Sequence, residues 1–323
     1  MTDVTSTLPA FLLQRLIRAL LLTIVVSSAA LTLVHLAPGD AFSDFTTDPE
    51  TAAAERARYG LDRPFLQQYV SWLGRAVTLD LGDSTRFRRP VAELLVERLP
   101  LTFMLGVAAL CIVVGLGIPL GVAGGARPNR WWARATRGWS MLMVSIPPLV
   151  MSLALLLLAA RTGWLPAGGL NVESSAPLAE RLALTLRSLI LPSLALGLPI
   201  AASVERLQAS ALMDALREPC VRAALARGVT DTRVIWNHAF RLSLKPVLAI
   251  FGVIVGTVLS GSLIVEIVMS WPGIGELMYQ ALVSRDLHLA GGCAATASVF
   301  LAAGVLLSDV ALALVDPRVR GVE

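Results

Sequence analysis

Histidine is the residue type best suited to acid–base catalysis or metal binding at neutral pH, and the chain has three, His35, His238 and His288. They are far apart in the sequence, and no His-Glu-x-x-His pattern, which would put two zinc ligands on one helix face, is present. No serine occupies a recognisable nucleophile setting, which argues against a membrane hydrolase. We therefore predict a chain without catalytic residues and without a metal site.

The motifs for phosphate and thiol chemistry are also absent from the sequence. A phosphate-binding loop needs the pattern Gly-x-x-x-x-Gly-Lys-Ser/Thr, but Lys245 is the only lysine and Pro246 follows it. Cys111, Cys220 and Cys293 form neither a disulfide framework nor a metal-binding pattern. We expect this chain alone to hydrolyse no ATP and to bind no cofactor.

The most unusual polar feature is the stretch REPCVRAALARGVTDTRVIWNHAFRLSLKP, residues 217–246, which holds five arginines and the only lysine. Good helix formers over residues 214–226 predict a helix, which Gly228 would end. Thr230 or the aspartate after it can cap a second helix, which Pro246 would interrupt. The stretch therefore predicts a helix, a glycine turn and a second helix.

Two interpretations of this stretch stay open from the residues alone. A basic amphipathic segment can be a solvated linker that lies on anionic lipid. However, Ala223, Ala224 and Gly228 would form a surface almost without side chains, and small residues let another backbone come close. The second interpretation predicts an interface with another polypeptide.

Membrane helices must position this stretch. A mean hydropathy of +0.71 with only 15% charged residues is more apolar than a soluble domain tolerates. Apolar runs of about 20 residues, the length that crosses the hydrocarbon core, recur along the chain. We expect six spans, near residues 14–36, 101–124, 137–160, 187–205, 246–267 and 289–314.

The arginines also predict the orientation, because basic loops are retained on the cytoplasmic side. The loop after the second span has four arginines and no acid, namely Arg127, Arg130, Arg134 and Arg137. This puts that loop, both termini and residues 206–245 in the cytoplasm, and residues 37–100 outside. The first span follows Arg15 and Arg18 as a signal peptide would, but no clear cleavage site comes after it, so an uncleaved span is expected.

Prolines within the spans predict bends. Pro147-Pro148 in the third span, and Pro192 and Pro199 around the fourth, each remove a backbone donor, so helices should kink or begin there. Kinked helices suit a path that opens and closes. Pro147, Pro148 and Ser152 are therefore candidates for a translocation path.

Glycines recur at the spacing that lets helices approach closely. Gly117, Gly121 and Gly125 form consecutive small-xxx-small steps, and Gly252 and Gly256 form another. These faces predict either ordinary helix contacts within the chain or contact with a partner subunit across a pore.

Two acids and one turn near span ends are further candidates for the path or its gate. A carboxylate that faces lipid is costly, so Glu266 and Asp309 either turn inward or reach the interface. Trp271, Pro272 and Gly273 form a rigid turn after the fifth span, which suits either a membrane-interface anchor or part of an external gate.

Residues 37–100 are too long for a plain connector. They carry Tyr59, Phe65, Tyr69 and Trp72 among mixed charges, which argues against a disordered loop. We expect a small helical domain outside the membrane.

Several motifs, taken in order along the chain, resemble a known family. RAALARG at 222–228 is similar to the signature loop of ATP-binding-cassette importer permeases, in the Arg-x-Ala form used by dipeptide and oligopeptide permeases. Further segments that resemble this family are LAPGD at 36–40, YGLDRPFLQQYVSWLG at 59–74, LDLGDS at 79–84, RPVAELLVERLPLT at 89–102, SWPGIG at 270–275 and LVDPRVR at 314–320. The resemblance covers nearly the entire chain.

This resemblance implies an all-α membrane protein with six transmembrane helices of the type I importer-permease kind. A small extracytoplasmic helical insertion would lie between the first and second helices. The implied domains are residues 1–36 with the first helix, the insertion 37–100, and a permease core 101–323 with five helices and the cytoplasmic coupling loop 206–245.

In this family the short cytoplasmic helix couples the permease to a separate ATPase subunit, which binds ATP and Mg. The residues implied to couple are Arg217, Glu218, Cys220, Val221, Arg222, Ala223, Ala224, Leu225, Ala226, Arg227 and Gly228. The sequence departs from the family where Pro219 and Cys220 replace an acidic–aromatic pair. The implied partners are a homologous second permease subunit, two ATPase subunits and an external solute-binding protein, at the bacterial cytoplasmic membrane.

The resemblance favours short peptides as the cargo, with nickel chelates or another small solute as the alternative. A stand-alone secondary transporter or channel is the rival class, which would need neither ATPase nor binding protein. Inverted repeats or ionisable residues at the bilayer midplane would favour that class, and neither is clear in this sequence.

Overall fold

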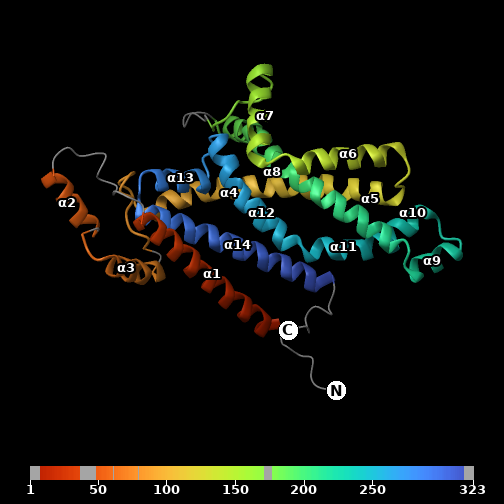
Figure 1. Ribbon diagram of the computed structural model, residues 1–323, viewed down its shortest axis with the longest axis horizontal. Coiled ribbons are helices and arrows are strands. Elements are labelled where there is room, and N and C mark those ends of the chain that lie inside the picture. Colours follow the sequence, from red (N-terminus) through yellow and green to blue (C-terminus); the bar gives the residue numbers. More distant parts are fainter. Residues whose placement is uncertain (1–7, 37–48, 61, 79, 171–176, 316–323) are drawn as a thin grey trace. The chain divides into compact units, whose positions relative to one another are not determined.

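The computed structural model describes residues 8–36, 49–60, 62–78, 80–170 and 177–315, which are almost wholly helical (Figure 1). In these residues the only β pairing is a single bridge between Asp83 and Pro90. The chain forms two compact units. Residues 104–271 make up most of the first unit, and residues 12–103 and 272–302 make up most of the second.

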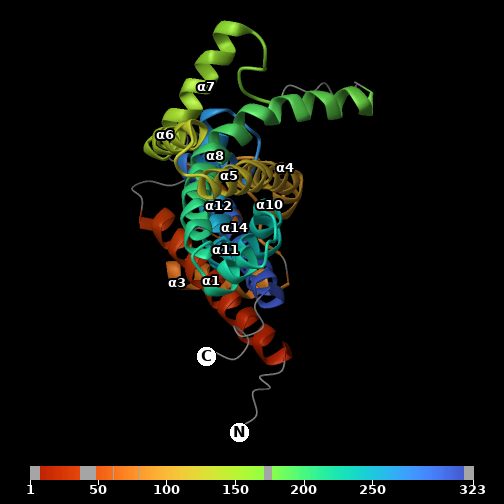
Figure 2. The ribbon, with the colours of Figure 1, turned by 90° about the vertical axis from the view of Figure 1, so that its right-hand side faces the viewer.

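Five described helices are long and apolar enough to cross a membrane: Leu16–Leu36, Val91–Ala126, Leu178–Ala215, Phe251–Val268 and Leu287–Leu306. α6 (Trp131–Ser145) and α7 (Pro148–Thr162) pass the same test as a pair, bent by 104° (Figure 2). The all-α membrane fold is thus confirmed, with five such helices and a sixth crossing if the bent pair forms one broken span.

The span expected near 137–160 is broken in two, because the chain bends between α6 and α7. Residues that precede a proline disfavour helical geometry, and Pro147 has a proline after it. Ile146 and Pro147 are accordingly extended, at ψ 115 and ψ 148, and α7 starts at Pro148. The prediction that a helix would begin at this pair is confirmed.

The first unit is built around α8 (Leu178–Ala215), against which η1 (Val113–Gly117), α5 (Ile118–Ala126), α6, α7, α11 (Phe240–Ala249) and α12 (Phe251–Val268) pack. Pro192 and Pro199 lie inside α8, which continues through both, so neither proline begins a helix as it could have. Each removes only its own backbone donor, and a long apolar helix tolerates that loss when neighbouring helices cover it.

Glycines bring α5 and η1 into backbone contact with α8. A Cβ atom at Gly117, Gly121 or Gly125 would lie only 2.8, 2.7 or 2.6 Å from a carbonyl oxygen of α8. Real Cβ atoms do not approach so closely, because van der Waals repulsion rises steeply at that distance. These glycines therefore serve helix contacts within the chain, the first of the two expected roles.

The second unit contains α1 (Leu8–Leu36), α2 (Pro49–Tyr59), α3 (Phe65–Val77), the first part of α4 (Val91–Ile112), α13 (Ile274–Val283) and the first part of α14 (Leu287–Val315). Its core includes Leu31, Trp72, Leu94, Leu277 and Leu289, which come from five of these helices. The sequence did not predict α13. α4 begins at Val91, earlier than the expected boundary at 100, and Pro100 lies inside it.

Candidate coupling surface

α9 (Pro219–Ala226) carries most of the residues expected to meet an ATPase. Pro219 occupies the first turn, where a helix needs no backbone donor. The preceding Glu218 is extended, at φ −59 and ψ 138, as a residue before proline prefers. The expected single helix over 214–226 is therefore wrong, because α8 ends at Ala215 and a turn precedes α9.

The other end of α9 follows the prediction. Gly228 adopts φ +83, the left-handed region that favours glycine. Its N–H donates to Leu225 O at 2.9 Å, and Val229 N–H donates to Ala224 O at 3.3 Å. This pair of bonds is a Schellman motif, which satisfies carbonyls at the helix end. Gly228 therefore ends α9, as predicted.

The second helix begins where the sequence predicts and ends later. α10 (Asp231–Val234) starts after Thr230, and the chain continues as a π-helical turn, η2 (Ile235–Ala239), into α11. Pro246 lies inside α11 and does not interrupt it, which corrects the expectation. A proline removes one backbone donor, and the other hydrogen bonds of α11 persist across Pro246. The helix ends instead at Ala249, and Ile250 separates it from α12.

One face of α9 is buried against its own chain. Val221 and Ala224 are 0% and 1% exposed and pack with Leu212 of α8 and Val234 of α10. Ala224 therefore does not belong to an exposed small surface, contrary to the expectation. Val221 and Ala224 instead hold α9 on the end of α8, where Figure 1 shows it beside α10.

The remaining candidate residues are exposed and form what we name the α9 surface: Arg217, Glu218, Cys220, Arg222, Ala223, Leu225, Ala226, Arg227 and Gly228. It combines three arginines and one glutamate with the small side chains of the alanines. Leu225 adds an apolar side chain that is 40% exposed. This surface can meet a partner by close backbone approach and by ion pairs at its edge.

Trp236 lies near this surface and was not predicted as a contact residue. It is half exposed although it is large and apolar, and its ring meets Phe240 edge-on, with centroids 5.5 Å apart. An exposed tryptophan is a common anchor of protein interfaces. The signal in the sequence was an aromatic pair four residues apart, Trp236 and Phe240, within a basic segment, which periodicity alone could not assign to an exposed face.

A buried polar cluster joins α8 to its neighbours, and the sequence did not reveal it. Glu205 is 3% exposed and accepts a hydrogen bond from Ser140 Oγ of α6 at 2.5 Å. One turn further on, Gln208 Nε2 donates to Ser243 Oγ of α11 at 2.8 Å. These bonds link three helices, and the Oε1 atom of Gln208 is left buried without a hydrogen-bond partner among the described atoms. A displacement at the α8 end would thus be shared with α6 and α11.

The candidates for a path in the first unit are mostly buried. Ser152 is 0% exposed and donates to Pro148 O at 2.8 Å, so its hydroxyl is satisfied inside α7. Glu266 is also fully buried in α12, which supports the inward alternative over one that reaches the interface. Trp271 is 1% exposed, and its burial contradicts the membrane-anchor alternative. The Trp271 N–H donates to the Glu266 carbonyl at 2.9 Å, so these two candidates are joined through the backbone at the end of α12, whereas Ser152 belongs to α7.

Pro272 and Gly273 belong to the second unit, where they lead into α13. Gly273 precedes the first residue of α13, Ile274, whose N–H donates to Thr102 Oγ1 of α4 at 2.7 Å. This bond caps α13 with a side chain from a distant helix. The side chain of Asp309 and the motif residues 37–40 and 316–320 lie outside the described residues.

Comparison with known proteins gives matches over nearly the whole chain. Residues 117–321 match the family described as binding-protein-dependent transport system inner membrane component. Residues 8–106 match the N-terminal region of such membrane components. The oligopeptide transport system permease protein AppB of Bacillus subtilis is 31% identical over 320 residues, covering 96% of this chain and 99% of AppB. The oligopeptide transport system permease protein OppB of Salmonella typhimurium is 29% identical over 313 residues, covering 96% and 99%.

Proposed function

We propose, because this chain belongs to the family of binding-protein-dependent transport system inner membrane components, that it is a permease subunit of an ATP-binding-cassette importer for short peptides. Full-length similarity to two oligopeptide permeases supports the peptide cargo. The observation that carries the coupling role is α9 itself, which is exposed on one face and held on α8 by the other.

The partners of such a subunit are a homologous second permease, two ATPases that bind ATP and Mg, and an external solute-binding protein. The α9 surface is the part that we assign to an ATPase. Its alanines allow close approach, while Leu225 and the nearby Trp236 supply apolar contact area. Arg217, Arg222 and Arg227 would meet acidic groups around that contact.

The chain transmits motion through contacts rather than through chemistry. When the ATPases close, a displaced α9 carries Val221 and Ala224 with it, and these residues pack on Leu212 near the end of α8. Packed interiors resist compression, so α8 moves with α9. The bonds from Ser140 to Glu205 and from Gln208 to Ser243 then pass the displacement to α6 and α11.

The orientation is part of the proposal. Arg127 and Arg130 lie between α5 and α6, and Arg134 and Arg137 lie in the first two turns of α6. These four arginines support a cytoplasmic side there, and α9 then lies on the same side, after two further crossings. The same count puts both termini in the cytoplasm and α2 and α3 outside, as a small helical insertion before α4. The membrane is then the bacterial cytoplasmic membrane.

The test is uptake by the complete importer in proteoliposomes. The chain is reconstituted with its second permease and ATPases, and its binding protein is added outside. We expect accumulation of a labelled tripeptide that needs both ATP and the binding protein. Uptake of a nickel chelate but of no peptide would refute the cargo. Uptake without ATP or without the binding protein would refute the class.

A further inference from the structure

A polar cavity of about 210 Å³ lies in the second unit, between α2, α3 and the start of α14. Its walls include three arginines, Arg58, Arg63 and Arg75, together with Tyr59 and His288. Gln68 and Ser71 also line it, and no carboxylate is among its lining residues. The cavity is therefore surrounded by cationic and neutral donors.

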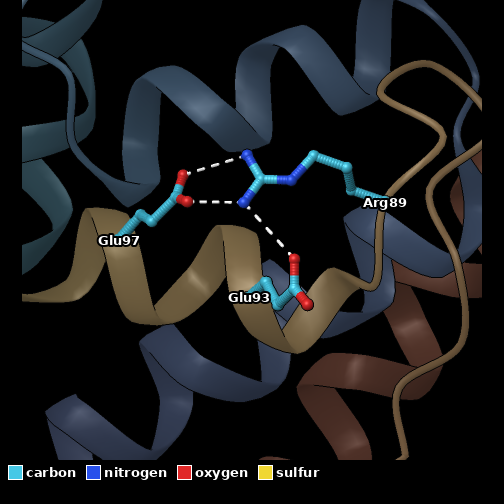
Figure 3. Close-up of polar contacts among 3 residues, drawn as sticks. All are labelled: Arg89, Glu93 and Glu97. Carbon is cyan, nitrogen blue, oxygen red and sulfur yellow. Dashed lines mark hydrogen bonds and ion pairs between the residues drawn. The ribbon is translucent and has the colours of Figure 1, made fainter.

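Arg89, which lies in the same unit but outside the cavity, has closer carboxylate partners than Arg58, which lines the cavity. The Arg89 guanidinium donates to Glu97 at 2.5 and 3.3 Å and to Glu93 at 3.3 Å (Figure 3). These hydrogen bonds raise the pKa of Arg89 above its usual range. Arg58, by contrast, has one carboxylate 4.0 Å away, that of Glu55, and its side chain is 74% exposed, so that ion pair is weak.

Arg75 is held in place from behind. His288 Nδ1 lies 3.2 Å from the carbonyl of Asp83, and His288 Nε2 lies 3.5 Å from Arg75 Nη2. Since a carbonyl only accepts and a guanidinium only donates, the imidazole is the neutral tautomer with its hydrogen on Nδ1. Arg75 Nε is buried without a hydrogen-bond partner among the described atoms, so it is not one of the donors that face the cavity.

The wall behind His288 is rigid. Asp286 is fully buried and accepts from Ser84 Oγ at 2.5 Å and from the N–H groups of Arg86 and Leu289 at 3.2 and 3.1 Å. A Cβ atom built on Gly82 would lie 3.2 Å from the His288 ring, and the φ of +81 at this position also favours glycine. Arg75 and His288 are therefore preorganised, which lowers the entropy cost of binding an anion, whereas Arg58 and Arg63 are exposed.

The cavity and the apolar surface of α3 lie on different flanks of that helix. At about 100° per residue, Gln68, Ser71 and Arg75 point about 150° away from Leu66 and Val70. Leu66 and Val70 are 71% and 59% exposed, so an apolar environment would cover that flank. A membrane that covers Leu66 and Val70 leaves the cavity open to water. This arrangement favours a water-borne ligand over a lipid headgroup.

We propose that this cavity is an anion site that receives an aspartate or glutamate side chain of the solute-binding protein. The inference rests on the proposed function, in which α2 and α3 lie outside the membrane. Small-molecule sites usually measure about 300–1,000 Å³, so this cavity is too small for a peptide but admits one side-chain carboxylate. Arginine recognises a carboxylate through paired N–H donors, and three arginines line this cavity.

The test is binding of the purified solute-binding protein to the complete importer in nanodiscs. Arg58→Gln/Arg63→Gln removes two guanidinium groups that are both exposed. We expect Kd to rise about tenfold in the double variant and about threefold in Arg63→Gln. Gln67→Glu is the control for Arg63→Gln, because it changes the net charge equally on an exposed position outside the cavity, and should shift Kd less than twofold. The rise should shrink between about 0.05 and 0.5 M salt, as screening increases.

Membrane abundance and subunit co-purification are measured for each variant, so that misassembly is recognised. Each candidate acidic residue of the binding protein is changed to lysine. One of these lysine variants should restore affinity for the Arg63→Glu importer, because the exchanged charges again attract each other. An unchanged Kd in the double variant would overturn the proposal. So would loss of co-purified anionic phospholipid at unchanged Kd, which would assign the cavity to lipid. A wild-type importer that binds no binding protein would overturn the proposed function itself.

Discussion

Gly228 offers the sharpest test of the α9 surface, because two substitutions there share one backbone cost. At φ +83 any residue with a Cβ atom is strained, by about 1–2 kcal/mol. Nothing lies within 4 Å of a Cβ atom built on Gly228, so this cost comes from the backbone and not from a clash. Gly228→Ala and Gly228→Trp should therefore destabilise the isolated chain by a similar amount.

The two variants differ only in what they present to a partner. A tryptophan at this exposed position adds a side chain to a surface that we assign to close approach, whereas alanine adds one methyl group. We expect membrane abundance to fall equally and modestly in both. Co-purification of the ATPases and transport-linked ATP hydrolysis should fall at least tenfold further in Gly228→Trp than in Gly228→Ala, about 1.4 kcal/mol or more of lost docking.

These quantities are measured side by side in the reconstituted importer. Equal coupling in the two variants would refute our reasoning, because bulk at the surface would then have no consequence. The stretch around α9 would in that case be a linker at the membrane surface, and another segment would have to meet the ATPase.

Three further predictions concern the rest of the chain. Gly121→Ala should lower stability in detergent by about 1–3 kcal/mol, because its Cβ would meet α8 at 2.7 Å, while Gly115→Ala, with nothing within 4 Å, should be nearly neutral in thermal unfolding. Ser140→Ala removes the hydroxyl that donates to a buried carboxylate and should cost about 1–3 kcal/mol in the same assay, whereas Ser140→Thr should recover part of the loss. Reporter fusions should be active in the cytoplasm after Gly125 and outside after Asp80, and the reverse pattern would disprove the orientation.

Local rules made part of this structure readable from the sequence. Apolar runs long enough to cross a membrane specify helices wherever they occur, because lipid provides no hydrogen-bond partner for a free backbone. Gly228 ends a helix because only glycine adopts the left-handed region without strain. The break at Pro147-Pro148 follows equally from the backbone preference of a residue before proline. The same rule applied to Glu218 predicts the turn before α9.

Tertiary structure decided everything that depends on which distant residues meet. Periodicity could not tell which face of α9 is buried, since Val221 and Ala224 are covered by α8 and α10, and alanine suits a core or an interface equally. Periodicity also could not predict that Trp271 is buried, or that Glu205 accepts a hydrogen bond from Ser140 of α6, which is 65 positions away in the sequence. Burial and hydrogen-bond partners are properties of the assembled helices, whereas helix ends are set by a few neighbouring residues, and this difference in range separates what the sequence determined from what the fold decided.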